Sequence, residues 1–494
     1  NECIPYYNGK DLIACICNAT YCDDIPNDDQ PKLAEHGTFY WYVSNLDGLR
    51  MNVSTAKIDE HESHDTSTTL VIDTETRYQR VFGFGAGITD SVGINLKKLS
   101  EDTQNQVIRT CYDPKVGSGY NIARIPIAGT DFSKEPYTYD DVDGDTSLEH
   151  FALAQADYDY KMPFLKKALA MNPTTKIISA PWSAPGWMKT SGQYEEFGYL
   201  KEEYYQIYAN YLVKFLEEYQ KNGLEMWAMA TSNEPTVHLE IHLPNIISMG
   251  WTPEGLSKWV ANNLGPTMAS SKSNNTHILA LGDYLTSLPW FVEPMLSNEN
   301  ASKYIVGTSV HWYFENRSHI TVLDGLHDEF PDKIILMTEA SQIPQFWGTP
   351  DALPQYWDLA QDYILSIIEY FNHWASGWMD WNMALNEEGG PDYPGRSLNA
   401  AILVNPEKDE FYKTPLFYAI KHFSRFVCRD SIRVSITDTE TIKTTAFVTP
   451  SKEVVVVLYN NQSTSDSVTL KDPLKGTIQL NLTPRSMNTI TYKL

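Results

Sequence analysis

Eight short apolar runs divide the middle of the chain at regular intervals. Amphipathic stretches such as YYQIYANYLVKFLEEYQKN separate them, so the pattern consists of eight β-then-α units and predicts a (β/α)8 barrel over residues 78–429. A doubly wound sheet would need a G-x-G-x-x-G turn after its first strand, and GFGAGITD lacks that spacing. The runs are RVFGFGAGI (80–88), NIARIPI (121–127), KIISAPW (176–182), EMWAMATSNEP (225–235), HILALGD (277–283), IVGTSVHWY (305–313), KIILMTEA (333–340) and GWMDWNMAL (377–385).

Both ends of the chain have the alternating pattern of β-strands. GTFYWYVSN, TTLVIDTE and six short runs after residue 430 alternate apolar and polar positions between turn residues. Because chain ends are often close in space, we predict one all-β sandwich built from residues 31–77 and 430–494. The whole is therefore an α/β protein, and 494 residues accommodate a barrel and an accessory domain.

The first thirty residues contain four cysteines but few core-forming residues. Without a core of its own, such a segment is expected to be stapled by disulfides, and we predict a small β region over 1–30 that includes part of 383–414. A zinc knuckle is disfavoured because no His lies in this segment and the Cys-x-Cys spacing is tight. The four cysteines are Cys3, Cys15, Cys17 and Cys22.

Charge and processing signals indicate the compartment and the class of partner. A net charge of −25 argues against nucleic-acid binding, and no apolar run is long enough to span a bilayer. The chain starts without Met and carries seven Asn-x-Ser/Thr sequons, so we expect a lysosomal or secreted mature form whose signal peptide has been removed. Six sequons are candidate glycosylation sites, at Asn18, Asn52, Asn274, Asn300, Asn316 and Asn461; Pro484 weakens the seventh, at Asn481.

Two carboxylates follow barrel strands that face each other across the predicted barrel mouth. Glu234 is the next-to-last residue of the fourth run and Glu339 the next-to-last of the seventh, and catalytic groups of such barrels lie at the carboxyl ends of the strands. Glycoside cleavage needs one carboxylic acid and one carboxylate, about 5–5.5 Å apart in retaining enzymes. Alternatively, Glu234 caps a helix and Glu339 pairs with Arg124 for structure alone. Asp131 could instead cap a helix, and His311, Trp182 and Trp381 could belong to the core. The other substrate-binding candidates at strand ends are Arg124, Asp131, Trp182, Asn233, His311, Trp312, Tyr313 and Trp381.

The motifs together resemble the acid β-glucosidases (glucosylceramidases) of glycoside hydrolase family thirty. They include NATYCDD, GFGAGITD, GYNIARIPIAGTDFS, SAPWSAPGWMKT, SNEP, VHWY, TEA and GWMDWNMALNEEGGP, in family order. The resemblance implies a retaining mechanism with Glu234 as acid/base and Glu339 as nucleophile. It also implies glucose binding by Asp131, Trp182, Asn233 and Trp381, disulfides Cys3–Cys15 and Cys17–Cys22, and no metal or cofactor.

The resemblance further implies glucosylceramide as substrate, lysosomal action and presentation of the lipid by a small saposin-type activator. Apolar residues in 241–251 and 341–348 beside the mouth favour a lipid and peripheral membrane contact, with packing against neighbouring loops as the alternative. The chain departs from the family at Thr231-Ser232, at Ser341 and in the loops 236–249 and 391–400. One alternative is another family β-glycosidase (glucosidase, xylanase or fucosidase) on soluble glycans. A non-catalytic carbohydrate-binding protein is disfavoured, because binding alone needs no acid and nucleophile pair.

Two further cysteines lie near the ends of helical segments on either side of the barrel seam. Cys111 ends the helix after the first strand, and Cys428 ends the helix after the eighth. These helices are neighbours in a closed barrel and their carboxyl ends share one face. We therefore predict a Cys111–Cys428 disulfide, with two buried free thiols as the alternative.

Overall fold

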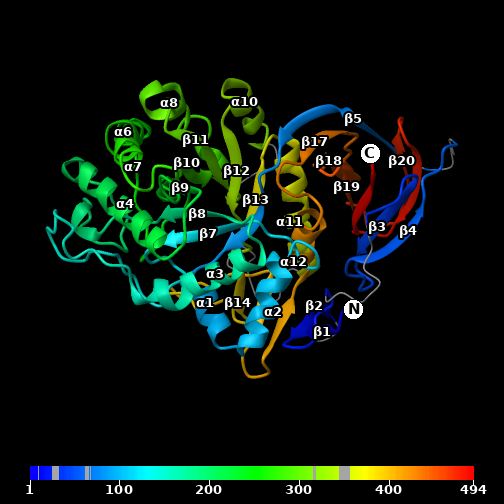
Figure 1. The fold of residues 1–494 in the computed structure, drawn as a ribbon, viewed down its shortest axis with the longest axis horizontal. Helices are drawn as coiled ribbons and strands as arrows, with labels where there is room; N and C mark the ends of the chain where they lie inside the picture. Colours follow the sequence, from blue (N-terminus) through cyan, green and yellow to red (C-terminus); the bar gives the residue numbers. More distant parts are fainter. Residues whose placement is uncertain (9–10, 25–32, 62–65, 67, 315–318, 344–355) are drawn as a thin grey trace.

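The fold combines a closed parallel barrel with a β-sandwich beside it (Figure 1). The structure, a computed structural model, describes residues 1–494 apart from 9–10, 25–32, 62–65, 67, 315–318 and 344–355. The sequon at Asn316 and residues 344–348 of the predicted apolar rim therefore lie outside the described residues. Within the described part, no helix has the length and apolar character needed to cross a bilayer.

All eight predicted runs form strands of the barrel, so the predicted fold is confirmed. The last strand pairs with the first and closes the ring. Most of these strands are buried on both faces, which is why they read as continuous apolar runs rather than as alternating ones. The strands are β6 (Gly83–Gly87), β7 (Ile122–Ile127), β8 (Lys176–Pro181), β9 (Ala228–Ala230), β10 (His277–Tyr284), β11 (Ile305–His311), β12 (Ile334–Glu339) and β13 (Gly377–Asn382).

The helices cover the outside of the barrel. α2 begins where the Ser100 hydroxyl accepts a hydrogen bond from the Thr103 amide, and α6 begins in the same way at Thr252. The helices are α1 (Asp90–Lys97), α2 (Glu101–Tyr112), α3 (Met162–Met171), α4 (Tyr205–Lys221), α5 (Val237–Glu240), α6 (Pro253–Trp259), α7 (Gly265–Ala269), α8 (Glu293–Ser297), α9 (Glu299–Ser302), α10 (Val322–Glu329), α11 (Tyr356–Asn372) and α12 (Pro415–Ser424).

The sandwich takes strands from both ends of the chain and packs against α11 and α12 (Figure 1). Its strand order is β21-β20-β5-β17-β18-β19-β22-β3-β4. His422 of α12 fixes the contact, because its two ring nitrogens lie 2.8 Å from the hydroxyl oxygens of Thr489 and Ser44. The strands are β3 (Thr38–Ser44), β4 (Asn52–Lys57), β5 (Thr68–Arg80), β17 (Ile432–Ile436), β18 (Ile442–Val448), β19 (Glu453–Asn460), β20 (Asp466–Asp472), β21 (Gly476–Leu482) and β22 (Met487–Lys493).

The N-terminal segment joins a five-stranded sheet with strands from the end of the barrel. Its order is β1-β2-β16-β15-β14. Both disulfides implied by the family resemblance are present, Cys3–Cys15 and Cys17–Cys22. The strands are β1 (Pro5–Asn8), β2 (Asp11–Asn18), β14 (Ala384–Asn386), β15 (Ile402–Asn405) and β16 (Glu410–Lys413).

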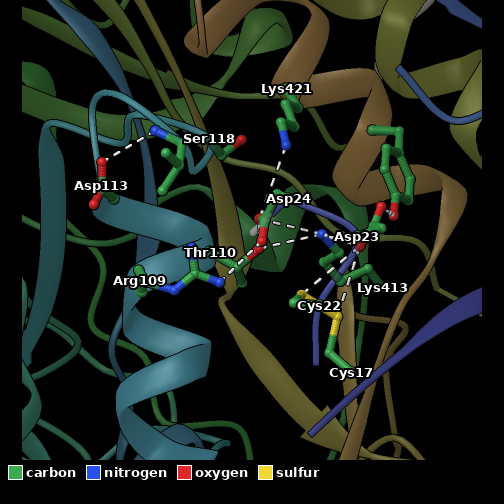
Figure 2. Close-up of polar contacts among 12 residues, drawn as sticks. Cys17, Cys22, Asp23, Asp24, Arg109, Thr110, Asp113, Ser118, Lys413 and Lys421 are labelled. Carbon is green, nitrogen blue, oxygen red and sulfur yellow. Dashed lines mark hydrogen bonds and ion pairs between the residues drawn. A yellow bond between two sulfur atoms is a disulfide. The ribbon is translucent and has the colours of Figure 1, made fainter. Parts of the chain in front are cut away.

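A buried charge cluster fastens this N-terminal segment to the barrel helices (Figure 2). Asp24 lies 3.1 Å from Arg109 of α2, 3.3 Å from Lys413 of β16 and 3.8 Å from Lys421 of α12, and Asp23 lies 2.6 Å from Lys413. Burial alone would raise the pKa of Asp24, but the three cations outweigh it and hold the pKa well below its ordinary value. The segment is therefore anchored by charge as well as by disulfides.

The predicted Cys111–Cys428 disulfide is wrong, because both cysteines are free thiols. Helix α12 ends at Ser424, so Cys428 lies on an exposed turn beyond it, 3.8 Å from the Ser431 hydroxyl. The end of α12 instead contacts the loop that follows α2, where the Ser424 and Ser118 hydroxyls lie 3.0 Å apart. Cys111 is instead buried in the core, and burial raises the pKa of its thiol.

Candidate active site

The ends of the barrel strands bring two glutamates face to face. Glu339 is the last residue of β12, and Glu234 follows β9 in the turn 231–236. A carboxylate oxygen of each and one ring nitrogen of His311 all lie within 4.8 Å of one another. The His311 Nδ1 atom is 3.8 Å from Glu234 Oε2 and 4.0 Å from Glu339 Oε2. The two carboxylates can therefore act on opposite sides of a single reacting atom.

Arg124, in the middle of β7, contacts Glu339 and Asn233, the residue that precedes Glu234. Its Nη1 donates to Glu339 Oε1 at 2.6 Å and its Nη2 donates to the Asn233 side-chain oxygen at 2.8 Å. The guanidinium also lies about 5 Å from the ring centroids of Trp182 and Trp381, at 5.0 and 5.1 Å. This buried ion pair gives Glu339 a cationic partner, whereas Glu234 receives a 3.4 Å hydrogen bond from the Asn233 amide.

Glu234 has the protonation behaviour expected of an acid that works near neutrality. Burial raises its pKa to about 7, against the lowering effects of the Tyr284 hydroxyl, the Arg124 charge and the Asn233 amide. Its backbone φ of 49° is in the left-handed region, which non-glycine residues seldom adopt, and its amide donates to the Gly282 carbonyl at 2.7 Å. The hydrogen bond to the end of β10 thus holds the backbone of Glu234 in this strained left-handed conformation.

Asp283, the residue after Gly282 on β10, holds the end of the turn 231–236 that contains Glu234. Its carboxylate accepts hydrogen bonds from the backbone amide and hydroxyl of Thr236, at 2.9 and 2.8 Å. A register shift between Leu281 and Asp283 aims the end of the strand at the turn. The sequence reasoning missed Asp283 and Tyr284, although the fifth apolar run ends at this point and its end could have been searched.

Asp131 reaches the site on a loop after β7 that rests on a buried lysine. Lys161 lies 3.5 Å from Asp90 and 3.6 Å from Asp157 and donates to the carbonyls of Pro126 and Ala128, each at 3.1 Å. Burial, reinforced by the charges of the two glutamates and of Asp392, raises the pKa of Asp131 to about 8. Lys161 escaped the sequence reasoning because a lysine in a helical stretch is ordinarily exposed.

These side chains surround a cavity of about 300 Å³ with one polar and one apolar wall. Trp182 and Trp381, which both line it, stack on each other with ring centroids 5.2 Å apart. The apolar wall comes mainly from residues 237–247, and Arg396 joins this segment to the loop after β14 by donating to the Pro244 carbonyl at 2.5 Å. The lining residues are Asp131, Phe132, Trp182, Asn233, Glu234, Val237, Ile241, Leu243, Ile246, Ile247, Ser248, Tyr284, Tyr313, Phe314, Glu339, Ile343, Trp381, Asp392, Arg396 and Leu398.

Most of the predicted site residues meet at this cavity. Asp131, Trp182, Asn233, Tyr313 and Trp381 line it together with both glutamates, and Arg124 and His311 lie next to the carboxylates without lining the cavity.

Trp312 is not among the residues that line this cavity, although it packs against the cluster of Val237, Tyr284 and Tyr313, which do, so its role in substrate binding stays a prediction. Its indole nitrogen donates to the Ser341 carbonyl at 3.1 Å, and its ring packs edge-on to Tyr363, with centroids 5.2 Å apart.

Comparison with known families decides the class of this site. Residues 81–427 match the glycosyl hydrolase family 30 TIM-barrel domain, and residues 430–490 match the family 30 beta sandwich domain. The chain belongs to glycosyl hydrolase family 30. This family 30 chain is therefore a glycosidase by class, and its cavity at the barrel mouth contains the carboxylate pair that such hydrolysis requires.

The relatives of this family 30 chain include both lipid and glucan hydrolases. It is 36% identical to the lysosomal acid glucosylceramidase of Mus musculus, over 99% of this chain and 95% of that one, and 36% identical to putative glucosylceramidase 3 of Caenorhabditis elegans, over 100% and 95%. Among solved structures, SrfJ from Salmonella typhimurium superposes with a TM-score of 0.86 at 25% identity, covering 92% of this chain and 100% of that one. The endo-β1,6-glucanase BT3312 superposes with a TM-score of 0.82 at 26% identity, covering 93% and 100%.

Proposed function

We propose that this family 30 chain is a retaining β-glucosidase that hydrolyses glucosylceramide to glucose and ceramide. The observation that carries the retaining mechanism is the separation of Glu234 and Glu339, whose nearest oxygens lie within 4.8 Å. Retaining enzymes place the two carboxyl groups about 5–5.5 Å apart, whereas inverting enzymes need roughly 6.5–9.5 Å to hold a water between them.

In the first step, Glu339 attacks the anomeric carbon as the bond to the leaving oxygen breaks. Glu234 gives its proton to that oxygen, and ceramide leaves as an alcohol. In the second step, water attacks the same carbon, Glu234 takes the proton of that water, and Glu339 is released. Arg124 keeps Glu339 oriented through the 2.6 Å ion pair, and Asn233 is placed to bind the sugar 2-hydroxyl.

The apolar wall supports a lipid aglycone. Val237, Ile241, Leu243 and Ile246 line the cavity. Leu239, in the same segment, is 62% exposed. We extend the proposal to peripheral contact with a membrane and to a saposin-type activator that presents the lipid.

We also propose a lysosomal or secreted site of action. This is supported by the two disulfides, the net charge of −25 and the exposed sequons at Asn52, Asn274 and Asn300.

Rates on glucosylceramide in mixed micelles, a fluorogenic β-glucoside and β-1,6-glucan test the substrate. The proposal predicts hydrolysis of both glucosides and, by ¹H NMR, a first-formed product glucose in the β configuration. Activity on β-1,6-glucan without activity on glucosylceramide would favour the soluble-glycan alternative, which the likeness to the endo-β1,6-glucanase supports. First-formed α-glucose would contradict the retaining mechanism.

A further inference from the structure

His311 is fully buried, yet neither of its ring nitrogens has a hydrogen-bond partner among the described residues. The contrast with His422 is direct, because that equally buried histidine has a hydroxyl 2.8 Å from each ring nitrogen. An unpartnered imidazole in the core costs free energy unless something binds to it. The Nδ1 atom of His311 is aimed at the gap between Glu234 and Glu339.

The three side chains offer the donor set of a divalent transition metal. Zn²⁺ takes imidazole nitrogen and carboxylate oxygen at about 2.0–2.2 Å, so tetrahedral ligands stand roughly 3.3 Å apart. The observed separations of 3.8 Å and 4.0 Å, with all three donors within 4.8 Å, need only a small inward shift. Arg124 occupies Glu339 Oε1 and leaves Oε2 facing the gap.

The net charge of the site also favours binding of a cation. With both glutamates deprotonated, as metal binding requires, the two carboxylates and one guanidinium leave one negative charge in a buried site, and a divalent cation would reverse that excess. The donor set also discriminates among cations, because Mg²⁺ and Ca²⁺ prefer six or more oxygen ligands and accept imidazole poorly.

We propose that Glu234, Glu339 and His311 bind a divalent transition-metal ion such as Zn²⁺, and that the bound ion reversibly inhibits hydrolysis. The ion occupies the two carboxylates that the reaction uses, so metal and substrate exclude one another. The inhibition rests on the proposed function; binding of the metal does not.

Isothermal titration of Zn²⁺ into the chelator-treated protein tests the site. We expect one ion per chain, with an affinity at least about tenfold weaker in His311→Ala and in Glu339→Gln. Glu339→Gln keeps the side-chain shape, so it remains informative if His311→Ala fails to fold. His373→Ala is the matched control, because His373 also lies between two acids, 3.0 Å from Asp324 and 3.6 Å from Glu369, at the opposite end of the barrel. Unchanged binding in both site variants, or its loss in the control, would overturn the proposal.

Inhibition kinetics supply an independent readout. With a fluorogenic β-glucoside, Zn²⁺ should raise KM and leave kcat unchanged, and Mg²⁺ at the same concentration should do neither. A protein that binds one Zn²⁺ at this site but cleaves no β-glucoside would retain the metal site and refute the proposed function. A protein that cleaves the glucoside but shows neither binding nor inhibition at millimolar Zn²⁺ would refute the metal site and leave the function standing.

Discussion

At the scale of single residues, the two glutamates differ in their partners. Glu339 is ion-paired with Arg124, whereas Glu234 is held by neutral donors from Asn233 and Tyr284. The same side-chain type can therefore serve as nucleophile in one place and as proton donor in the other, which is how glycosidases commonly divide the work.

Substitution of each glutamate should separate the two roles. Glu339→Gln removes the nucleophile and should abolish turnover of every substrate. Glu234→Gln removes only the proton donor, so it should slow a β-glucoside with a poor leaving group about 10²–10⁴-fold and spare one with an acidic phenol. Initial rates on a series of aryl β-glucosides measure this difference. An equal loss across the series would remove Glu234 from the acid role.

The pH dependence should report Glu234. Because burial raises its pKa to about 7 and the first step needs it protonated, kcat/KM should fall as pH rises through about 7. For a substrate with an acidic leaving group, Glu234→Gln should remove this alkaline limb, while Asp131→Asn should not. A limb centred near about 4.3, the ordinary value for glutamate, would contradict the burial of this carboxyl.

At the scale of elements, the buried cluster around Asp24 joins β16, α2 and α12 to the N-terminal segment. Asp24→Asn removes the carboxylate that pairs with Lys421 and leaves Lys413 with Asp23 alone, so it should destabilise the protein by about 3–5 kcal/mol. Thermal or urea unfolding measures this loss. Asp430→Asn, which breaks an ion pair whose side chains are 68% and 58% exposed, is the control and should cost at most about 1 kcal/mol.

The sign of the pH effect on this cluster follows from the lowered pKa of Asp24. A depressed folded-state pKa adds stability that is present above the unfolded value, about 3.9, and is lost as pH falls below it. The difference between the parent protein and Asp24→Asn should therefore be the same at pH 5 and pH 7 and shrink towards pH 2. A difference that already shrinks between pH 7 and pH 5 would contradict the charge pairing.

The burial and the ends of the helices and strands explain which features could be predicted from the sequence. Strands β6 to β13 are buried on both faces, so each gives a compact apolar run whose end marks the barrel mouth, and Glu234 and Glu339 followed from that position. Lys161 could not be found, because its burial depends on Asp90 and Asp157, which no local pattern links to it. The cysteine prediction failed because α12 ends four residues before Cys428.

At the scale of the whole molecule, the cavity opens beside an exposed apolar segment. Leu239, 62% exposed, should contact a lipid surface, so Leu239→Asp should lower activity on glucosylceramide vesicles roughly tenfold and leave a soluble β-glucoside unaffected. Leu474→Asp is the matched control, since Leu474 is 61% exposed on the sandwich between β20 and β21. Equal effects of the two changes, or a loss on the soluble substrate, would argue against a membrane-facing role for this segment.

The central claim is that Glu339 forms a covalent bond to the sugar. A 2-deoxy-2-fluoro-β-glucosyl fluoride reacts with the nucleophile of a retaining enzyme and hydrolyses slowly, because the fluorine disfavours the oxocarbenium-like transition state. Incubation followed by peptide mass spectrometry measures the adduct directly. We predict one fluoroglucosyl group per chain, on Glu339 in the peptide that contains KIILMTEA. An adduct on another residue, or an active enzyme that forms none, would contradict the account.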